Sequence, residues 1–428
     1  MADEAVASAE TKSWLYQPVF PEHWERRPLY SLAQWVNGLA FRDIQFSPTG
    51  RPVIKIAEIK GGISGQTKFT EQVFDESVRV RAGDLLFSWS GQPETSIDVF
   101  WWRGSDGWLN QHSFRVTPVE GVDPTFFFYL LRYLKPNFVG IARNKQTTGL
   151  GHVTKRDLEA IEAAYPSLPE QRAIAHILGT LDDKIELNRR INETLEAMAR
   201  AMFKSWFVDF DPVGAKAEGR DPGLPKPVAD FFPDSFENSE LGAIPAGWGV
   251  GRLDDVLVLQ RGFDLPTSLR TPGLYPVIAA SGPNGSHNQF MVRGPGVTTG
   301  RSGVLGNVFY VHQDFWPLNT SLWVKEFKAS TPAYAFYLLR GLDFRLFNAG
   351  SAVPTLNRNH VHGLPTLMPP MKLIEAFEAF AVTTLRRQRT GEIESSTLAS
   401  LRDALLPKLI SGELRIHDAE RFIGGEKR

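Results

Sequence analysis

Tyr129-Leu130-Leu131-Arg132 recurs as Tyr337-Leu338-Leu339-Arg340, and this repeated tetrapeptide decides the fold class. Matches continue outward from it on both sides in the same order. They pair Trp24 with Trp248, Leu29 with Leu253, Gly38 with Gly262, Leu109-Asn110 with Leu318-Asn319, Pro124 with Pro332, Pro166 with Pro369, Ala173 with Ala376, Leu195 with Leu398 and Ala201 with Ala404. A period this long is not that of a solenoid repeat. We therefore predict a duplicated, pseudo-two-fold symmetric unit, which suits a ligand with two similar halves such as duplex DNA.

Length and composition indicate a soluble globular protein with several domains. The 428 residues are enough for two to four hydrophobic cores, and 42% hydrophobic with 22% charged residues is ordinary for such proteins. The absence of cysteine excludes disulfides, thiolate zinc sites and cysteine nucleophiles. Residues 1–12 contain no apolar signal-peptide core, and no run approaches the roughly 20 apolar residues that span a bilayer. We expect a cytoplasmic protein with no membrane partner.

The formal net charge of −1 argues against a simple non-specific nucleic-acid binder, because such proteins usually carry a basic excess. Local basic patches remain compatible with this value. A DNA cleft completed by a more basic partner subunit is compatible as well.

Short strands, glycine turns and few helices are expected on either side of the middle of the chain, which predicts two α+β domains. In the first, Lys55–Ile59 alternates apolar and polar residues as a half-buried strand does. Leu85–Phe87 is a short apolar run typical of a buried strand. Thr125–Leu134 is apolar and aromatic with Pro124 at its head, which predicts a buried helix.

A long helix is predicted from Ser167 to Phe207. Ser167-Leu168-Pro169-Glu170 has the spacing of a capping box, with Pro in the first turn. Apolar residues then follow a heptad pattern, at Ile174, Ile177, Leu181, Ile191, Leu195, Met198 and Met202, and Asn188 occupies one position of the same seam. Such a helix is about 60 Å long, too long for an ordinary domain core. A buried Asn at a seam position fixes the register of a coiled coil.

A second long helix is predicted near the C-terminus, where Phe377, Phe380, Leu398, Leu401 and Leu405 occupy the matching positions. Its middle is less apolar, with Thr384, Arg387, Gly391 and Glu394 interrupting the seam. Gly391 alone costs about 1 kcal/mol relative to Ala. We expect the two helices to pair antiparallel, with their ends packed better than the centre of the second helix.

Candidate catalytic motifs are few, and each has a simpler explanation. Glu58-Ile59-Lys60 has the Glu-x-Lys spacing of some metal-dependent nucleases, but no Pro-Asp precedes it, and a solvated strand face is the better explanation. His360-Val361-His362 offers two metal ligands on one strand face, but no third ligand lies nearby, and a polar loop that contacts DNA is the favoured interpretation. Gly300–Gly306 lacks the Gly-Lys-Ser/Thr ending of a phosphate loop.

Two further enzyme signatures are missing from the sequence. It contains neither an Asn-Pro-Pro-aromatic or Asp-Pro-Pro-aromatic tetrapeptide of amino-methyltransferases nor a Gly-x-Ser-x-Gly elbow. We therefore predict a binding protein with no catalytic residue and no metal site.

Polar and aromatic loop residues are the candidate DNA contacts, because Asn and Gln pair bidentately with adenine and Arg or Lys with guanine. In the first copy they are Trp89, Gln92, Arg103, Arg143, Asn144, Lys145, Gln146, Thr147 and Thr148, and in the second Asn284, His287, Asn288, Arg301, Arg358, Asn359 and His360. Trp101, Trp102, Ser281 and Asn319 lie in the same loops. The two sets differ while their frameworks match, as expected of one scaffold adapted to two targets.

Several segments, taken in order, resemble the specificity subunits of type I restriction–modification systems. They are Pro166-Ser167-Leu168-Pro169-Glu170-Gln171-Arg172-Ala173-Ile174, Leu181-Asp182-Asp183-Lys184-Ile185, Phe203-Lys204-Ser205-Trp206-Phe207-Val208-Asp209-Phe210, Gly242-Ala243-Ile244-Pro245-Ala246-Gly247-Trp248 and Leu405-Leu406-Pro407-Lys408-Leu409-Ile410-Ser411-Gly412-Glu413. Met371-Lys372-Leu373-Ile374-Glu375 departs from the pattern, since it lacks the Glu-Gln pair of the first copy.

The resemblance implies two target-recognition domains, each bound to one half of a split site in double-stranded DNA. The long helices would form an antiparallel coiled-coil spacer, with Ile174, Ile177, Leu181, Asn188, Leu195, Met202, Leu398, Leu401 and Leu405 in its seam. The implied partners are two methyltransferase subunits and endonuclease/translocase subunits. S-adenosylmethionine and ATP would bind to those partners, and this chain would hold no cofactor.

The resemblance and the repeat together give one division of the chain. It comprises an N-terminal segment 1–23, a first recognition domain 24–166, a central helix 167–211, a Pro/Gly-rich linker 212–247, a second recognition domain 248–368, a C-terminal helix 369–414 and a tail 415–428. Two other functions stay open at this point. One is a stand-alone metal-dependent DNA enzyme that uses Glu58 and Lys60, and the other is a coiled-coil protein scaffold.

Overall fold

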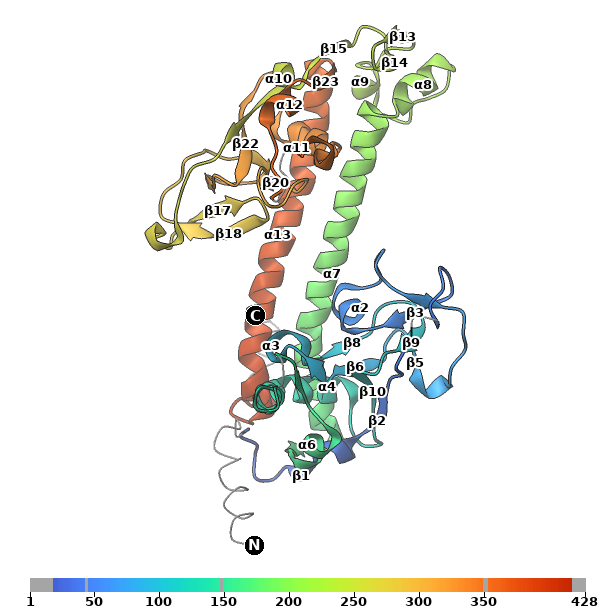
Figure 1. Ribbon diagram of the computed structural model, residues 1–428, viewed down its shortest axis with the longest axis vertical. Coiled ribbons are helices and arrows are strands. Elements are labelled where there is room, and N and C mark those ends of the chain that lie inside the picture. Colours follow the sequence, from blue (N-terminus) through green and yellow to red (C-terminus); the bar gives the residue numbers. More distant parts are fainter. Residues whose placement is uncertain (1–17, 43–44, 147–148, 349–352, 418–428) are drawn as a thin grey trace. The chain divides into compact units, whose positions relative to one another are not determined.

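The computed structural model describes residues 18–42, 45–146, 149–348 and 353–417, in two compact units (Figure 1). Unit 1 comprises Met1–Glu186 and Ser395–Arg428, and unit 2 comprises Leu187–Glu394. Each unit contains one α+β domain and one half of each long helix. Two of the predicted DNA contacts, Thr147 and Thr148, lie outside the described residues.

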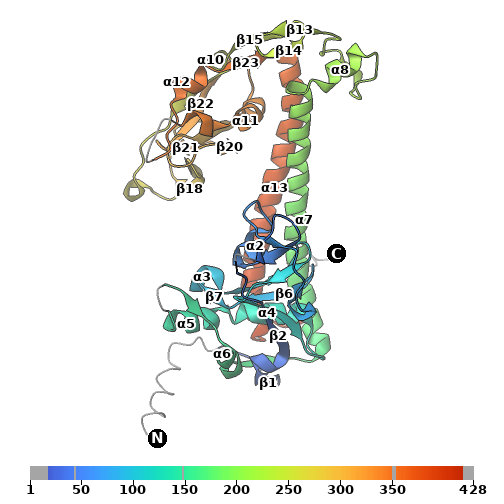
Figure 2. The same cartoon turned by 45° about the vertical axis from the view of Figure 1, so that its right-hand side comes forward.

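The two long helices are α7 (Leu168–Phe207) and α13 (Met371–Ile410), each of 40 residues. In unit 1, the start of α7 shares a core with the end of α13, through Ile174 and Leu181 on one helix and Leu405 on the other. In unit 2, the end of α7 shares a core with the start of α13, where Trp206 lies 6.3 Å from Phe377 between ring centroids. The pairing is therefore antiparallel in each unit, as predicted, and within each unit both views show α7 and α13 side by side (Figures 1 and 2). None of the described helices is long and apolar enough to cross a bilayer.

Polar side chains join α7 and α13 within unit 2. The buried Asn188 donates from Nδ2 to Oε2 of Glu394 at 2.9 Å. Asn192 and Gln388 exchange hydrogen bonds, each donating its side-chain amide to the other's main-chain oxygen, at 3.2 and 3.0 Å. A Cβ on Gly391 would lie 3.0 Å from Oδ1 of Asn192, so glycine allows the close approach. The predicted register-fixing position at Asn188 thus makes a specific polar contact.

The buried face of α7 departs from the predicted heptad beyond Asn188. Leu195 and Met202 are only half-buried, whereas Ala199, Phe203 and Trp206 are buried in the core of unit 2. A straight α-helix drifts by about 20° per heptad relative to a 3.5-residue repeat, so a fixed heptad loses the buried face over several turns. The end of α7 also packs against the second domain, and this contact buries the helix face that carries Ala199, Phe203 and Trp206.

The main sheet of unit 1 is antiparallel and has the strand order β2-β10-β6-β8. Its strands are β2 (Ala33–Asn37), β10 (Ser113–Pro118), β6 (Leu85–Ser88) and β8 (Asp98–Trp101). A smaller sheet has the order β4-β3-β9-β5, with β4 (Phe69–Thr70), β3 (Arg51–Ile54), β9 (Gly107–Leu109) and β5 (Arg79–Val80), and β3 is parallel to β9. Two short pairs complete the unit, β1 (Glu25–Pro28) with β12 (Glu162–Tyr165) and β7 (Ser90–Gly91) with β11 (Gly151–His152).

Short helices connect these strands. They are η1 (Leu29–Leu32), α2 (Ile56–Gly61), η3 (Glu76–Val78), α3 (Pro93–Ser96), α4 (Pro124–Tyr133), α5 (Lys135–Asn144) and α6 (Lys155–Ala160). Helix α4 confirms the predicted buried helix, and β6 confirms the buried strand.

Unit 2 repeats this topology. Its main sheet has the order β16-β22-β19-β20, formed by β16 (Leu257–Arg261), β22 (Ser321–Phe327), β19 (Gly296–Gly300) and β20 (Val308–Val311). Its smaller sheet, β18-β17-β21, contains β18 (Gly282–His287), β17 (Tyr275–Ala279) and β21 (Trp316–Pro317), with β17 parallel to β21. The pair β15 (Gly249–Arg252) and β23 (Pro365–Met368) corresponds to β1 and β12. The duplicated α+β domain is therefore confirmed.

The remaining elements of unit 2 are a hairpin and short helices. The hairpin joins β13 (Phe236–Ser239) and β14 (Gly242–Pro245), inside the segment predicted as a linker. The helices are α8 (Asp211–Ala217), α9 (Lys226–Ala229), α10 (Leu253–Val256), η4 (Thr267–Leu269), α11 (Pro332–Arg340), η5 (Phe344–Phe347) and α12 (Arg358–His362).

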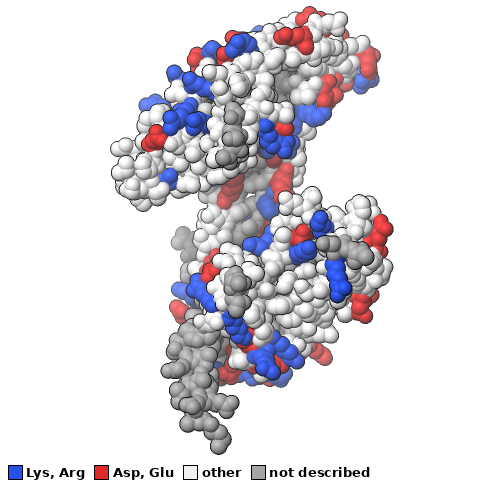
Figure 3. Space-filling model, viewed as in Figure 1, with Lys and Arg blue, Asp and Glu red and all other residues white. Residues whose placement is uncertain are grey.

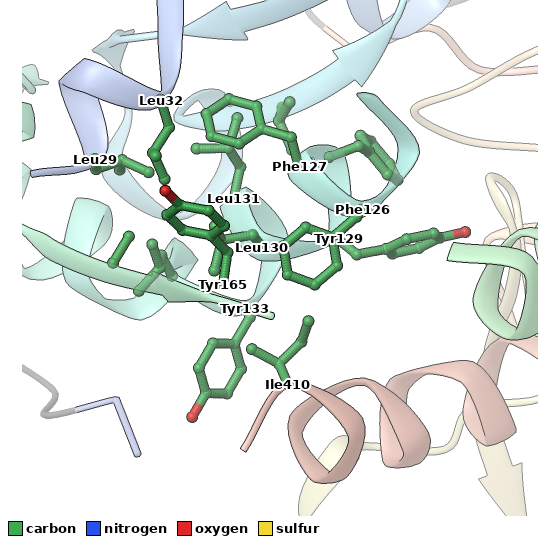
Figure 4. Packing of buried hydrophobic residues seen from close by; sticks show 14 of the residues in the cluster. Leu29, Leu32, Phe126, Phe127, Tyr129, Leu130, Leu131, Tyr133, Tyr165 and Ile410 are labelled. Carbon is green, nitrogen blue, oxygen red and sulfur yellow. The ribbon is translucent and has the colours of Figure 1, made fainter. Parts of the chain in front are cut away.

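Helix α4 attaches the first domain to the long helices of unit 1. Its aromatic residues lie in one core with Ile410 of α13 (Figure 4). The Tyr129 hydroxyl donates to Oδ2 of Asp182 at 2.6 Å, and Arg402 of α13 forms an ion pair with the same carboxylate. Burial and the neighbouring Asp182 raise the pKa of Tyr129 far above its usual value, so the phenol stays a donor.

The N-terminus of α4 is fixed by Gln171, a residue of the predicted first turn of the long helix. Its Oε1 accepts from the main-chain N–H of Asp123 at 2.8 Å, and its Nε2 donates to the carbonyls of Gly121 and Pro166. Asp123 in turn caps α4 by accepting from the N–H groups of Thr125 and Phe126. The first turn of α7 therefore holds the N-terminus of α4 as well as its own helix.

Helix α11 has a different cap in unit 2. Glu378 of α13 accepts from the hydroxyl of Thr331 and from the N–H groups of Ala333 and Tyr334. A carboxylate at a helix N-terminus satisfies free donors and complements the helix dipole. The start of α13, Met371–Glu375, lacks the Glu-Gln pair found at the start of α7. In its place, Glu378, one turn further along α13, caps the domain helix of unit 2.

The predicted strand Lys55–Ile59 is wrong, because Ile56–Gly61 forms helix α2. The side chain of Glu58 folds back on the helix start, accepting from the N–H of Lys55 at 3.1 Å and from the hydroxyl of Thr67 at 3.1 Å. Lys60 donates to the carbonyl of Thr95. Six residues are too few to display a helical period, so the alternation was misleading.

The His360-Val361-His362 segment is helical, since it forms the end of α12, and the predicted strand face is wrong. His362 points into the domain, where its Nε2 accepts from the N–H of Leu259 at 2.9 Å, while His360 is exposed. The described residues contain no group of three or more His, Cys, Asp or Glu side chains placed to hold a metal ion.

Unit 2 is expected to lose stability in mild acid through His362. Burial lowers the pKa of His362 below 6.5, although the nearby Asp254 opposes this effect. Below about pH 6.5, His362 is protonated more readily in the unfolded chain than in the folded unit. The free energy of unfolding therefore falls as the pH drops below this value. A H362Q variant keeps a neutral acceptor for Leu259, so its urea midpoint should depend less on pH between 7 and 5.

Some pH dependence should survive in H362Q, because burial also lowers the pKa of His312 in the same unit. The H360Q variant serves as the control, since His360 is exposed on the same short helix. Equal pH slopes for wild type and H362Q would show that His362 does not contribute.

Candidate nucleic-acid interface

In each domain, several loops meet at one end of the main sheet, and the loops of the first domain have equivalents in the second. In the first domain, the N–H of Gly38 donates to the carbonyl of Ser113 at 3.1 Å, and the N–H of Leu39 donates to that of Leu109 at 2.8 Å. A Cβ at Gly38 would overlap the carbonyl oxygen of Asn110, so only glycine permits the approach. The end of β2 and the start of β10 are thereby held together.

The second domain makes the same contacts. Gly262 donates to Ser321 at 3.0 Å, Phe263 donates to Pro317 at 2.8 Å, and a Cβ at Gly262 would overlap Leu318. These bonds correct the sequence alignment by one residue. Leu109 corresponds to Pro317, and the N–H of Gln111 bonds to Leu39 as that of Asn319 bonds to Phe263. Gln111 and Asn319, two carboxamides, are therefore structural equivalents.

Trp89 and Arg301 occupy a second equivalent position, immediately after β6 and β19. The N–H of Trp89 donates to His112 at 3.2 Å, and that of Arg301 donates to Thr320 at 2.8 Å. Their carbonyls accept from Val153 and Leu356, both at 2.8 Å. The same backbone framework thus presents an indole in one domain and a guanidinium in the other.

We define loop cluster 1 as Asn37, Trp89, Gln111 and His112, which all lie in unit 1. The indole Nε1 of Trp89 donates to Oδ1 of Asn37 at 3.0 Å, and its ring lies 5.8 Å from the imidazole of His112. The Gln111 amide approaches Nε2 of His112 at 3.4 Å. Amide, imidazole and indole groups therefore share one partly exposed surface.

We define loop cluster 2 as the equivalent residues of unit 2, which are Arg261, Arg301, Asn319 and Thr320. Nη1 of Arg301 donates to the carbonyl of Asn319 at 3.1 Å. The side chains of Asn319 and Arg261 both approach Asp264, the former by a hydrogen bond and the latter by an ion pair of 3.4 Å. This cluster is rich in cationic donors, whereas loop cluster 1 has none of these.

Several predicted contacts of the first domain are engaged within the protein. Arg103 forms an ion pair with Glu186 and lines a groove of about 590 Å³ between β8, α4 and α7. Arg143 pairs with Glu94 at 2.5 Å, and Lys145 pairs with Asp157 at 2.6 Å. Burial raises the pKa of Asp157, but hydrogen bonds from Lys145 and Thr154 outweigh it and leave the pKa lowered.

Three further predicted contacts, Gln92, Asn144 and Gln146, are exposed. Gln92 lies just before α3, Asn144 ends α5, and the Gln146 amide donates to the carbonyl of Gly149 at 2.8 Å. The predicted run from Arg143 to Gln146 is thus partly neutralised by its own domain.

The predicted contacts of the second domain lie in two further places. Asn284 and Asn288 are exposed near β18, where Nη1 of Arg270 donates to Oδ1 of Asn284 at 2.7 Å. His287 is only 6% exposed, and its Nδ1 lies 3.1 Å from the N–H of Thr271, so a structural role accounts for it.

The remaining three predicted contacts, Arg358, Asn359 and His360, form the exposed face of α12. The main-chain N–H of Asn359 is held by Oδ1 of Asn357, the N-cap of this short helix. None of the three belongs to loop cluster 2.

Sequence reasoning missed Asn37, Gln111, His112, Arg261 and Thr320. The signal that would have found most of them was present, because Asn37 and Arg261 directly precede the matched Gly38 and Gly262. Gln111 and His112 follow the matched Leu109-Asn110. The sequence alignment paired Leu109 with Leu318, one residue too far, so it did not place Gln111 opposite Asn319.

Charge is mixed on the surface of both units. On the face shown in Figure 3, Lys and Arg side chains are interspersed with Asp and Glu. This agrees with the net charge of −1 and differs from the continuous basic stripe of a strong phosphate binder.

Comparison with known proteins finds a matching domain and several relatives. Residues 21–197 match the model of the type I restriction modification DNA specificity domain. The MjaIX specificity subunit of a type I restriction enzyme from Methanocaldococcus jannaschii is 26% identical over 341 residues, which are 72% of this chain and 73% of that protein. The HindI specificity subunit from Haemophilus influenzae is 35% identical over 171 residues, 39% of this chain and 35% of that protein.

A solved structure shares the fold. The S subunit of a type I restriction–modification system from M. genitalium aligns with a TM-score of 0.55 at 16% identity, covering 92% of this chain and 97% of that one. The chain is therefore similar to type I restriction–modification specificity subunits, in the sequence of its first half through the domain match and in its fold through the solved structure.

Proposed function

We propose that this chain is the DNA-recognition subunit of a type I restriction–modification complex and that each recognition domain binds one half of a bipartite site. The carrying observation is the pair of loop clusters, which share a backbone framework and differ in chemistry. Base edges in the major groove are distinguished by the donors and acceptors presented to them. Two frameworks with different side chains are therefore suited to two different half-sites.

The long helices act in this proposal as the spacer between the half-sites. Each continues from one unit into the other, and each is anchored at both ends in a domain core. A helix of 40 residues is about 60 Å long, while one duplex turn is about 34–36 Å. The bases between the half-sites would then be fixed in number and left unread.

The same proposal assigns catalysis to partner subunits. Two methyltransferase subunits would supply S-adenosylmethionine chemistry and many of the phosphate contacts that a chain of net charge −1 lacks. Endonuclease/translocase subunits would use ATP. This chain would hold neither cofactor, would catalyse no reaction, and would act in the cytoplasm.

A solitary nuclease is disfavoured, because Glu58 is buried and committed to helix α2 and Lys60 to the carbonyl of Thr95. A pure protein scaffold would leave the two polar loop clusters without a purpose. We therefore favour DNA recognition over both alternatives.

The decisive experiment compares genome-wide methylation in a host that expresses the partner methyltransferase with and without this chain. A split motif of two short half-sites around a fixed spacer should be present only with this chain. Identical methylation in both strains, with a folded and co-purifying complex, would refute the recognition role.

The spacer role predicts that paired heptad insertions lengthen the unread spacer. One heptad is added after Asn188 in α7 and one before Glu394 in α13, which keeps the contacts of Asn188 and Asn192 intact. Seven residues add about 10 Å, which corresponds to about three base pairs of 3.4 Å, and seven residues restore nearly the same helix face. Motif determination should show a longer spacer and unchanged half-sites. A spacer of unchanged length would contradict the model.

Docking of a methyltransferase on the helices predicts an exposed apolar patch with a measurable role. Leu187 is 49% exposed and Met198 51% exposed, and they lie three turns apart on one face of α7 within unit 2. The L187E/M198E variant should fold normally but co-purify with methyltransferase at least about 10-fold less, since two buried apolar side chains contribute more than 1.4 kcal/mol. L241E is the control, because Leu241 is 46% exposed in a surface hairpin. Equal recovery with both variants would place the contact elsewhere.

A further inference from the structure

Resting on the proposed function, we propose that loop clusters 1 and 2 are the base-reading elements, in which Gln111 reads an adenine and Arg261 a guanine in opposite half-sites. The observation is that four structurally equivalent positions carry Asn37, Trp89, Gln111 and His112 in one domain and Arg261, Arg301, Asn319 and Thr320 in the other. Neither the fold nor the family match distinguishes these positions from the other exposed loops.

The backbone around each cluster is built for precision. Residues from three separate strand ends are tied by main-chain hydrogen bonds of 2.8 to 3.2 Å, in nearly the same pattern in both domains. Gly38 and Gly262 are required by the close approach of the next segment. Base recognition needs donors and acceptors that are held in place, and strand ends hold side chains better than long loops do.

Within loop cluster 2, Arg261 is the group suited to a base edge. Its side chain is 51% exposed, and its contact with Asp264 is a single ion pair of 3.4 Å. A guanidinium presents a planar fork that matches O6 and N7 of guanine. The acid orients the side chain while most of its five donors are left for a ligand.

Arg301 of loop cluster 2 and the adjacent Asp264 are positioning residues. Arg301 is half-buried, and among the described residues its guanidinium donates one hydrogen bond, to the carbonyl of Asn319. Asp264 accepts from the Asn319 amide and pairs with Arg261. The network therefore joins the end of β16 to the start of β22 and fixes the direction in which Arg261 points.

Loop cluster 1 contains no guanidinium or ammonium group, and its chemistry is that of a different base. The carboxamide of Gln111 presents one donor group and one acceptor, which match N7 and the N6 amino group of adenine. His112 lies 3.4 Å away between the two side-chain nitrogens, and the indole of Trp89 packs beside the imidazole at 5.8 Å. Asn37 fixes the indole through its Oδ1. The aromatic groups limit the orientations open to Gln111.

Other polar groups near the domains were weaker candidates for base reading. Arg103, Arg143 and Lys145 are neutralised by Glu186, Glu94 and Asp157. His287 is buried. The residues on α12 lie on a single exposed turn of a five-residue helix, outside the strand ends that form the loop clusters. The two loop clusters combine exposure, rigid backbone and opposite composition.

The test is motif determination by genome-wide methylation, using the complete complex of this chain with its methyltransferase. Q111A should relax one position, an adenine, in one half-site. R261Q should relax one position, a guanine, in the other half-site. For each variant, preference for the cognate base over the others should fall by about 10-fold or more, since one bidentate contact carries that much discrimination. The spacer and the opposite half-site should not change.

Matched controls separate base reading from general effects. Gln34 is exposed at the opposite end of β2. Arg252, the last residue of β15, is exposed and forms an ion pair with Asp254 of α10. Q34A and R252Q should leave the motif unchanged. If R261Q fails to assemble, R261K keeps the charge but loses the planar fork, so the same relaxation is expected from it.

Three outcomes would overturn the inference. Both variants could alter the same half-site, or methylation could fall uniformly at all sites with an unchanged motif, as loss of a phosphate contact would cause. An unaltered motif at unaltered levels would also contradict it. Failure of the proposed function has a separate signature, because the wild-type chain would then direct no split motif at all.

Discussion

Each α+β domain depends on the burial of one aromatic helix against the long helices, and the rest of each unit follows from this contact. In unit 1, α4 contributes Phe126, Phe127 and Tyr129 to a core that contains residues of α7 and α13. In unit 2, α11 contributes Tyr334 and Tyr337 to the equivalent core. Neither domain has a main core independent of the helices. Packing against the helices therefore fixes the orientation of each main sheet on its helix pair. A domain joined to the helices only by a flexible linker would not have a fixed orientation.

The polar contacts around α4 and α11 satisfy the same physical needs with different residues. The buried Tyr129 donates to Asp182, which Arg402 neutralises. In unit 2, the Tyr337 hydroxyl lies 3.4 Å from Oε2 of Glu196, and the other oxygen of that carboxylate pairs with Arg340. The α4 N-terminus is capped by its own Asp123, while that of α11 is capped by Glu378 from the long helix. Because an unpaired buried donor costs about 1–3 kcal/mol, each copy must retain some partner but not a particular one. The duplication has conserved the geometry more strictly than the side chains.

The features predicted best from the sequence are those with a long signal. The repeat around Tyr129 and Tyr337 and the seam of α7 extend over many residues, so single substitutions do not obscure them. The short helix α2 was mistaken for a strand because six residues show no period and because its decisive contact, from Glu58 to Thr67, lies outside the local pattern. Leu195 and Met202 were assigned to the seam by a strict heptad, whereas the domain core selects Ala199 and Phe203. The matched Gly262 marks Arg261 in the sequence, but the sequence does not show that Arg261, Arg301 and Asn319 meet, since they do so only through tertiary pairing.

The placement of the loop clusters explains how recognition can change without loss of the fold. Every member lies at or beyond a strand end, while the strands themselves bury Leu85, Phe87 and Val116 in one domain and Leu259, Val297 and Leu322 in the other. Stability depends on these apolar residues and on Gly38 and Gly262, which the close backbone approach restricts to glycine. The cluster side chains are partly solvated, so their replacement costs little folding free energy. Under the proposed function, selection on DNA sequence can therefore act on Trp89 or Arg301 independently of selection on the core. Two copies of one domain then come to carry an indole and a guanidinium at the same point of the same framework.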